Sequence, residues 1–426
     1  MKEKAGNTIK LVIFTAILGA FAGAVIWVFL KGVALGADLL WNELWQITGI
    51  PYPAIAVCAL LGLICGVIRK RFGDYPEELP VVMKKIKKDK YYDYKPMAVI
   101  LVMAFIPLII GSSVGPEAGL TGIIAALCYW VGDNVSFAKN DTASFSEIGE
   151  ALTLGQLFHS PLFGILAVEE SEEGEEIKAP GMSKGSKLLL YGISTASGFL
   201  VIEVLNSLFG EAMEGFPSFE EATVQRADYL MLIVYIITGL VLYHLFELSE
   251  KLTGEMGKRI PPVLRETLCG IVIGVAVAFF PMVMFSGEEQ MSKLMGSYML
   301  YAWPVLMGIA LLKVFMTAFC INFGMKGGHF FPLIYASTCM GYAISFLVFK
   351  DPAPHAAFAA ASITAALFGA QLKKPFAAAL LLLLCFPVRI LFWIFLCAVI
   401  GAQIAKTAQT AQAARAEKIK NTEADT

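Results

Sequence analysis

Long apolar runs are the feature of this chain that most restricts its fold. A transmembrane α-helix needs about 20 mainly apolar residues. Seven runs approach or reach that length: Leu11–Leu30, Ala54–Ile68, Leu188–Leu208, Tyr229–Phe246, Leu268–Phe285, Met299–Phe319 and Phe376–Ile400. Shorter or interrupted stretches lie at Met97–Ile110, Leu120–Val131, Ile148–Val168, Phe330–Phe349 and Ala356–Phe368. The sequence therefore predicts an all-α polytopic membrane protein with ten to twelve membrane segments.

Composition argues against several other classes of protein. Hydrophobic residues make up 57% of the 426 residues and charged residues 16%, whereas soluble domains have about 25% charged residues. The 33 basic residues nearly balance the 35 acidic ones, which argues against a nucleic-acid partner. The eight cysteines form no CxxC pair and the four histidines no HxxxH pair, so no metal or other cofactor is expected. A cytosolic enzyme is excluded.

Basic residues predict how the chain is oriented in the cell membrane, because loops rich in lysine and arginine stay in the cytoplasm. Three lysines lie among the first ten residues, and nine basic residues follow in the segment Arg69–Lys95. Two predicted spans separate these regions, so both are assigned to the cytoplasm. The polar tail, residues 406–426, is assigned there as well, so that both termini are cytoplasmic.

Two interruptions of the apolar pattern carry most of the functional information. Gly111–Gly119 and Gly324–Pro332 are rich in glycine, and each lies between two apolar stretches. A helix that is broken inside the bilayer leaves backbone groups unpaired, at several kcal/mol each, unless protein or a polar cavity covers them. Breaks at matching positions of two halves are typical of transporter sites near the middle of the membrane.

The interruptions belong to a pattern that occurs twice. Pro161 lies 44 positions after Glu117, and Pro375 lies 45 positions after Phe330. Each of these prolines leads a further apolar segment, so the order of break, apolar stretch and proline is repeated. The predicted organisation is a single membrane domain, residues 1–426, with repeats at 10–210 and 220–405.

The start of a helix is suited to bind an anion, because its first N–H groups have no partner in the helix and carry a partial positive charge. Glycines before the helix let backbone amides approach a small ion closely. Two such ends that face one another would form a dehydrated anion site. The alternative is a pair of packing turns at which helices cross closely.

Glu117 gives a second reason to expect an anion site. It is a lone carboxylate in an apolar region, where burial of its charge costs about 2.5–3.5 kcal/mol or more. At the start of a helix this carboxylate can occupy the place of an anion, take up a proton and move aside. One side chain would then be competitor, gate and proton carrier. The alternative is a glutamate that only caps a helix.

Several segments, in the same order, resemble the CLC family of chloride channels and chloride/proton antiporters. Gly115–Gly119 resembles the motif that carries the gating glutamate of that family, and Gly328–Pro332 resembles its G-x-F-x-P motif. His159–Glu170 is similar to a further helix of the family. The resemblance covers residues 10–405 and implies a homodimer with inverted repeats and broken, tilted helices of unequal length.

The resemblance also implies roles for particular residues. The gating and proton-transfer residues would be Glu117 and Glu170, although Glu170 also begins an acidic run that is typical of a solvated loop. The residues that would hold the anion are Gly115, Pro116, Ala118, Gly328, His329, Phe330 and Phe331.

The chain departs from the family pattern at four places. In the first motif, Pro116 replaces the basic residue and Gly119 the final proline, and in another segment Gly73 stands in the place of a serine that coordinates the anion. The late tyrosine that coordinates the central anion has no counterpart after Gly401. These departures leave open the inner gate and the preference for chloride.

The function predicted from the sequence is transmembrane anion transport, in the form of chloride/proton antiport. Passive anion conduction is the close alternative. A cation-coupled solute transporter of unrelated fold is an alternative of another class, as is an integral membrane enzyme. An enzyme would need a cluster of catalytic side chains that the sequence does not show, so the chain is not expected to be one. The expected partners are a small inorganic anion, protons, the lipid bilayer and a second copy of the chain.

Overall fold

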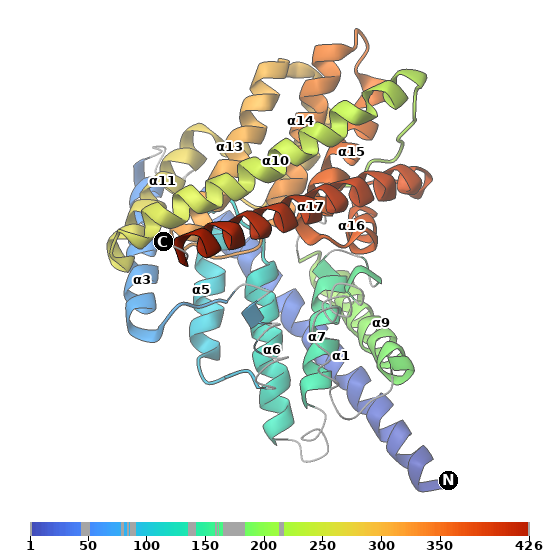
Figure 1. The fold of residues 1–426 in the computed structure, drawn as a ribbon. Helices are drawn as coiled ribbons and strands as arrows, with labels where there is room; N and C mark the ends of the chain where they lie inside the picture. The colour runs from blue at the N-terminus through green and yellow to red at the C-terminus, as the bar shows by residue number, and fades with distance from the viewer. Residues whose placement is uncertain are drawn as a thin grey trace. The chain divides into compact units, whose positions relative to one another are not determined.

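The computed structural model describes residues 2–43, 52–77, 81–82, 85, 91–134, 142–157, 160, 162–164, 184–212 and 217–424. These residues are mainly helical (Figure 1). The described part contains no β-strand, and its one isolated β-bridge joins Gly115 to Gly328. Contacts between residues divide the chain into two compact units.

The first unit comprises Met1–Phe216, Ser249–Ser292 and Phe315–Pro332. It consists of the N-terminal half of the chain and two later segments, the first of which begins within helix α10 (Arg226–Lys258). Its helices are α1 (Lys2–Asp38), the π-helical turn η1 (Leu39–Glu43), α3 (Tyr52–Phe72), α5 (Met97–Ile109), α6 (Glu117–Asn134), α7 (Thr142–Leu157), α9 (Lys184–Phe209), α11 (Pro262–Phe279), the 3₁₀ turn η3 (Pro281–Val283) and the first part of α12 (Glu288–Ser297).

The second unit comprises Pro217–Leu248, Lys293–Val314 and Leu333–Thr426. It contains the 3₁₀ turn η4 (Tyr298–Leu300), α15 (Ala353–Leu372), α16 (Pro375–Leu382), the 3₁₀ turn η5 (Val388–Ile390) and α17 (Leu391–Ala424). Three long helices contribute residues to both units: α10 (Arg226–Lys258), α13 (Trp303–Asn322) and α14 (Phe330–Val348).

Small residues set the closest helix contacts within each unit, as is usual where helices pack in a membrane. In the first unit α3 lies beside α11 (Figure 1), and a Cβ added to Gly270 would overlap the carbonyl of Cys58. In the second unit α15 packs on α17, and a Cβ on Gly401 would overlap the carbonyl of Ala366. A larger side chain at either glycine would push the paired helices apart.

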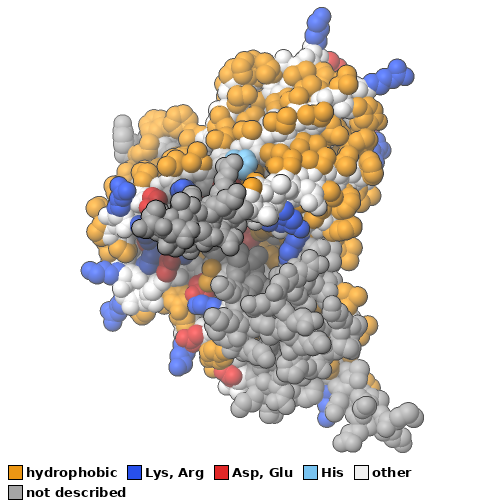
Figure 2. Space-filling view, in the orientation of Figure 1, with side chains coloured by type: hydrophobic (Ala, Val, Ile, Leu, Met, Phe, Trp, Pro, Cys, Tyr) orange, Lys and Arg blue, Asp and Glu red, His pale blue; other side chains and the backbone are white. Residues whose placement is uncertain are grey.

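Within the described ranges, eight helices are long and apolar enough to cross a membrane, and Met97–Ile109 and Glu117–Val131 are shorter apolar helices. Large hydrophobic side chains are exposed on many of these helices, for example Leu230, Ile233 and Ile237 along one side of α10. Figure 2 shows hydrophobic side chains over much of the described surface. Such exposure is unusual for a soluble protein and expected for helices that contact lipid.

Two of the predicted spans are too long. The span Phe376–Ile400 is wrong as one segment, because α16 ends at Leu382 and α17 begins only at Leu391. Pro387 lies between them and has no N–H group with which to continue a helix. The span Leu268–Phe285 is also wrong at its end, because α11 stops at Phe279, two residues before Pro281.

The C-terminal tail and the two predicted repeats are the remaining points of organisation. The polar tail at 406–426 is helical up to Ala424, as the continuation of α17. The division into repeats at 10–210 and 220–405 stays a prediction, because the two units are defined by contacts and not by symmetry.

Candidate anion site

The two glycine-rich interruptions have the same backbone design. Each follows the end of a helix, α5 or α13, and each begins with a glycine in the left-handed region, Gly111 with φ 82° and Gly324 with φ 97°. Six residues later the next helix begins, α6 at Glu117 and α14 at Phe330. Both helix starts were predicted from the sequence and are confirmed.

Hydrogen bonds at the two interruptions match as well. In each, the glycine N–H donates to a carbonyl three residues earlier, and the next N–H donates to a carbonyl five residues earlier, which is the Schellman pattern of a helix end. The bonds are Gly111 to Leu108 (3.3 Å), Ser112 to Pro107 (3.0 Å), Gly324 to Ile321 (3.2 Å) and Met325 to Cys320 (2.9 Å). Carbonyls at the end of both preceding helices are therefore paired, and the chain changes direction at the glycine.

The two interruptions meet inside the first unit. The N–H of Gly115 donates to the carbonyl of Gly328 at 2.8 Å, and the N–H of Gly328 donates to the carbonyl of Gly115 at 2.7 Å. Nearby in the chain, the buried hydroxyls of Ser113 and Thr317 lie 3.0 Å apart and form a further bond between the two sides. The broken backbone is thus paired with itself rather than left exposed to lipid.

The carboxylate of Glu117 lies at this junction, with 1% of the residue exposed. Its Oε1 accepts a hydrogen bond from the N–H of Phe331 at 3.5 Å, and the N–H groups of Phe330 and of Glu117 itself also interact with it. Its Oε2 has no hydrogen-bond partner among the described residues. A Cβ added to Gly115 or Gly328 would overlap the carboxylate. We call this arrangement of two glycines and three amides the Glu117 cradle.

The cradle has the properties of a site for a small anion. Backbone N–H groups at the start of α14 point at a negative group, where the partial charge of a helix start favours it. The negative group at these amides is the side chain of Glu117. A proton on this side chain would remove its charge, and with it the main reason for it to stay against the amides.

The other predicted anion-site residues surround the cradle or lie next to it. Pro116 and Ala118 are buried, and the carbonyl of Pro116 accepts the N–H of Leu120 at 3.0 Å. His329 is partly exposed, and its ring lies 4.9 Å from the ring of Phe330.

The helix that carries the predicted proton-transfer residue is described only in part. Phe163, within the predicted segment His159–Glu170, lies edge-on to Phe330 with ring centroids 6.5 Å apart. Glu170 and His159 lie outside the described residues. The sequence-based role of Glu170 therefore stays a prediction.

Two polar groups beside the cradle were not identified from the sequence. One is the Ser113–Thr317 pair, which joins the interruption before α6 to helix α13. The other is a group of charged side chains around Arg69 that contacts the carbonyl of Gly324. Serine in a Gly-Ser-Ser turn and arginine at the end of an apolar run are so common that neither gave a signal. Within the described ranges no three His, Cys, Asp or Glu side chains are grouped to hold a metal ion.

Interrupted helices that meet at a buried carboxylate, in a chain of many apolar helices, define the class of multi-pass membrane transport proteins with discontinuous helices at the site. The sequence profile of the family described as "Voltage gated chloride channel" (Voltage_CLC) matches residues 61–406. This is most of the chain, so the protein belongs to this family, as the motifs around Glu117 and Phe330 led us to expect. Membership supports the expectation that the protein is not an enzyme.

Solved structures agree with this family at the level of the fold. Three similar ones are a CLC-type fluoride/proton antiporter (TM-score 0.71, 17% identity, 94% of this chain and 96% of that chain covered), a slow cyanobacterial Cl⁻/H⁺ antiporter (0.77, 17%, 95% and 95%) and a eukaryotic CLC transporter (0.67, 17%, 94% and 72%). No curated protein gives a significant match. The predicted all-α, multi-pass membrane fold of the CLC type is therefore confirmed.

Proposed function

We propose that this protein exchanges a small inorganic anion for protons across the membrane, and that Glu117 is the side chain that couples the two. The observation that carries the proposal is the position of the Glu117 carboxylate, which is buried against the N–H of Phe331 and over Gly115 and Gly328. Two of the similar structures are antiporters, one of fluoride and one of chloride, with protons. Their shared coupling to protons supports exchange, while the identity of the anion differs between them.

The mechanism follows from competition for one place. Deprotonated Glu117 fills the cradle and excludes the anion. When it takes up a proton, its charge no longer favours the amides of Phe330 and Phe331, so the side chain leaves and the anion binds there. When the anion departs, the side chain returns and releases its proton. Each anion that passes thus requires a change of protonation at Glu117, which is the basis of coupling.

Proteoliposomes that contain the purified protein test this mechanism. Anion efflux and internal pH are recorded together for chloride and for fluoride, with and without sodium. We expect efflux of at least one anion, proton movement in the opposite direction and no need for sodium. Sodium-dependent uptake with indifference to both halides would contradict the proposal and favour the cation-coupled alternative.

The variant Glu117→Gln separates exchange from passive flow. It keeps the shape of the side chain but has no proton to gain or lose, so anion flux should continue while proton movement stops. Glu255→Gln is the matched control, because Glu255 is an exposed carboxylate of α10 that pairs only on the surface with Lys258. Full proton coupling in Glu117→Gln would remove Glu117 from the mechanism.

Passive anion conduction is the second candidate, and the description of the family as a chloride channel favours it. The reversal potential under a pH gradient distinguishes the two candidates. A potential that shifts with pH indicates exchange, and one that depends on the anion gradient alone indicates a channel.

Orientation and assembly are part of the same proposal. The basic residues before Leu11 and in Arg69–Lys95 support cytoplasmic termini, because positive loops are retained on that side. The resemblance to the CLC family supports a homodimer. Labelling of a single cysteine introduced near either terminus in intact cells tests the first point. The mass of the purified protein in detergent, expected at about twice 46.2 kDa, tests the second.

A further inference from the structure

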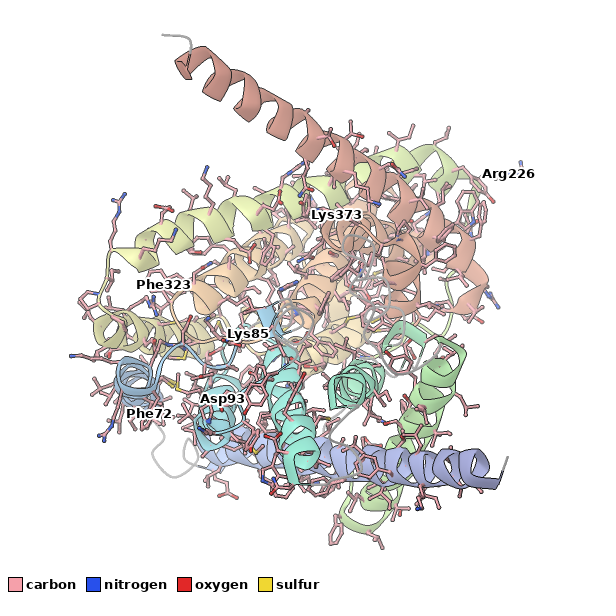
Figure 3. All side chains as sticks on the ribbon, turned by 60° about the horizontal axis from the view of Figure 1, so that its bottom comes forward. Phe72, Lys85, Asp93, Arg226, Phe323 and Lys373 are labelled. Carbon is pink, nitrogen blue, oxygen red and sulfur yellow. The ribbon has the colours of Figure 1, made fainter. Side chains whose placement is uncertain are left out.

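A group of charged side chains surrounds the start of the second interruption, within the first unit. We call it the Asp74 cluster, and its members are Arg69, Asp74, Arg265, Glu266 and Lys326. Figure 3 labels Phe72, the last residue of α3, and Phe323, which follows α13. Asp74 follows Phe72 in the chain, and Lys326 follows Phe323. The cluster contains three positive and two negative side chains.

Arg69 is the fixed part of this cluster. Only 4% of its side chain is exposed, and it pairs with the fully buried carboxylate of Glu266 and with Asp74. Its Nη2 donates to the carbonyl of Gly324 at 2.5 Å. A Cβ on Gly324 would overlap Glu266, so the backbone lies directly against the buried ion pair. Arg69 and Glu266 therefore hold the start of the second interruption in place.

Asp74 is the exchangeable part of the cluster. Its Oδ1 contacts Arg69 and its Oδ2 lies 2.6 Å from Nζ of Lys326, so each carboxylate oxygen is bound to a different cation. The side chain of Asp74 is 61% exposed and that of Lys326 17% exposed. The pair of Asp74 with Lys326 has this access to water and contributes only about 0–1 kcal/mol, so a dissolved anion can replace the carboxylate at Lys326 at small cost.

The cluster lies next to the cradle along the chain. Lys326 precedes Gly328 by two residues, so their Cα atoms are at most about 7 Å apart even if the segment is fully extended. Gly328 contacts the Glu117 carboxylate. An anion held by Lys326 is thus one short step from the amides that Glu117 now occupies.

We propose that the Asp74 cluster is a second anion subsite, in which Asp74 is the resident competitor and Arg69 with Lys326 holds the transported anion once Asp74 moves away. The proposal rests on the anion transport proposed above. It assigns to Asp74 at this second subsite the part that Glu117 plays in the cradle: a carboxylate of the chain fills an anion position until an anion replaces it. Departure of Asp74 leaves a positive group that raises the local anion concentration.

Two variants test this subsite in proteoliposomes, with chloride and fluoride as probes. Asp74→Asn removes the competing charge, so the half-saturating anion concentration on the side that reaches the cluster should fall about threefold to fivefold. Lys326→Gln removes one of the cations, and the same concentration should rise by a similar factor. In both variants protons should still move against the anion, because Glu117 and the cradle are intact.

Matched controls come from an exposed ion pair of α10. Glu255 and Lys258 lie 3.0 Å apart on the surface of the same unit, so Glu255→Gln and Lys258→Gln change the net charge by the same amounts. Neither control should alter the half-saturating concentration. Binding of chloride to the detergent-solubilised variants, measured by calorimetry, gives the same comparison without transport.

The outcomes distinguish this proposal from the one it rests on. If wild-type protein moves no anion, the proposed function fails. If it moves anions with protons, but Asp74→Asn and Lys326→Gln keep the wild-type half-saturating concentration, the cluster is only a clamp and the subsite is refuted. A lower thermal stability without a change in anion affinity would also refute it.

Discussion

Gly115 and Gly328 exchange two backbone hydrogen bonds, of 2.8 and 2.7 Å, although 213 positions of sequence separate them. Both α-carbons also lie against the carboxylate of Glu117, so the same two residues join the interruptions and form the floor of the cradle. This pairing explains how a broken backbone is tolerated among apolar helices, because N–H and C=O groups of one interruption bond to those of the other. The same contacts leave no room for a Cβ atom at either position.

Gly328→Ala is expected to close the cradle. The added Cβ would take the volume of the Glu117 carboxylate and therefore of the anion that replaces it. Anion flux should fall at least about tenfold, which corresponds to 1.4 kcal/mol of lost binding. Gly308→Ala is the matched control, because Gly308 lies in the apolar helix α13 with no atom within 4 Å of an added Cβ. Normal flux in Gly328→Ala would contradict the position assigned to the anion.

Glu117→Ala should raise the affinity for the anion. Removal of the side chain leaves the amides of Phe330 and Phe331 without their resident acceptor, so a dissolved anion no longer has to displace it. We expect calorimetry in detergent to show chloride or fluoride binding several-fold tighter than in the wild type. Weaker binding would mean that Glu117 supports the anion instead of competing with it.

The interruptions and the buried carboxylate were predictable from the sequence, and the reason is local. An apolar run that stops at Gly111 or Gly324 and resumes after a short glycine-rich segment predicts a broken helix, and a lone Glu117 between apolar residues predicts a buried carboxylate beside the break. Hydrophobic pattern and glycine content decide such features without knowledge of the rest of the fold.

The partners of these features were not predictable. No local rule states that Gly115 pairs with Gly328, or that the carbonyl of Gly324 is held by Arg69 from 255 positions away. Arg69 stands in a run of three basic residues at the end of α3, which by itself indicates a solvated loop. The break after α16 was missed for the opposite reason, because Phe376–Ile400 is apolar throughout except at Arg389, and the effect of Pro387 was outweighed by that pattern.

The buried ion pair of Arg69 and Glu266 leads to a prediction about stability. Removal of one partner of a buried pair leaves an uncompensated charge and costs about 3–5 kcal/mol. Arg69→Gln should have the larger effect, because Glu266 is fully buried and, among the described side chains, then has Arg265 at 3.4 Å as its one remaining cation. Glu266→Gln should have the smaller effect, because Arg69 keeps Asp74 and the Gly324 carbonyl.

Thermal unfolding in detergent, followed by tryptophan fluorescence, measures these differences, and the double variant Arg69→Gln/Glu266→Gln shows whether the two side chains act as a pair. We expect the double variant to lose less stability than the sum of the single variants, since no buried charge is left without a partner. Lys258→Gln breaks a surface pair and should change stability by no more than about 0.5 kcal/mol. Additive losses would show that Arg69 and Glu266 contribute separately, through Gly324 and through packing, and not through their mutual attraction.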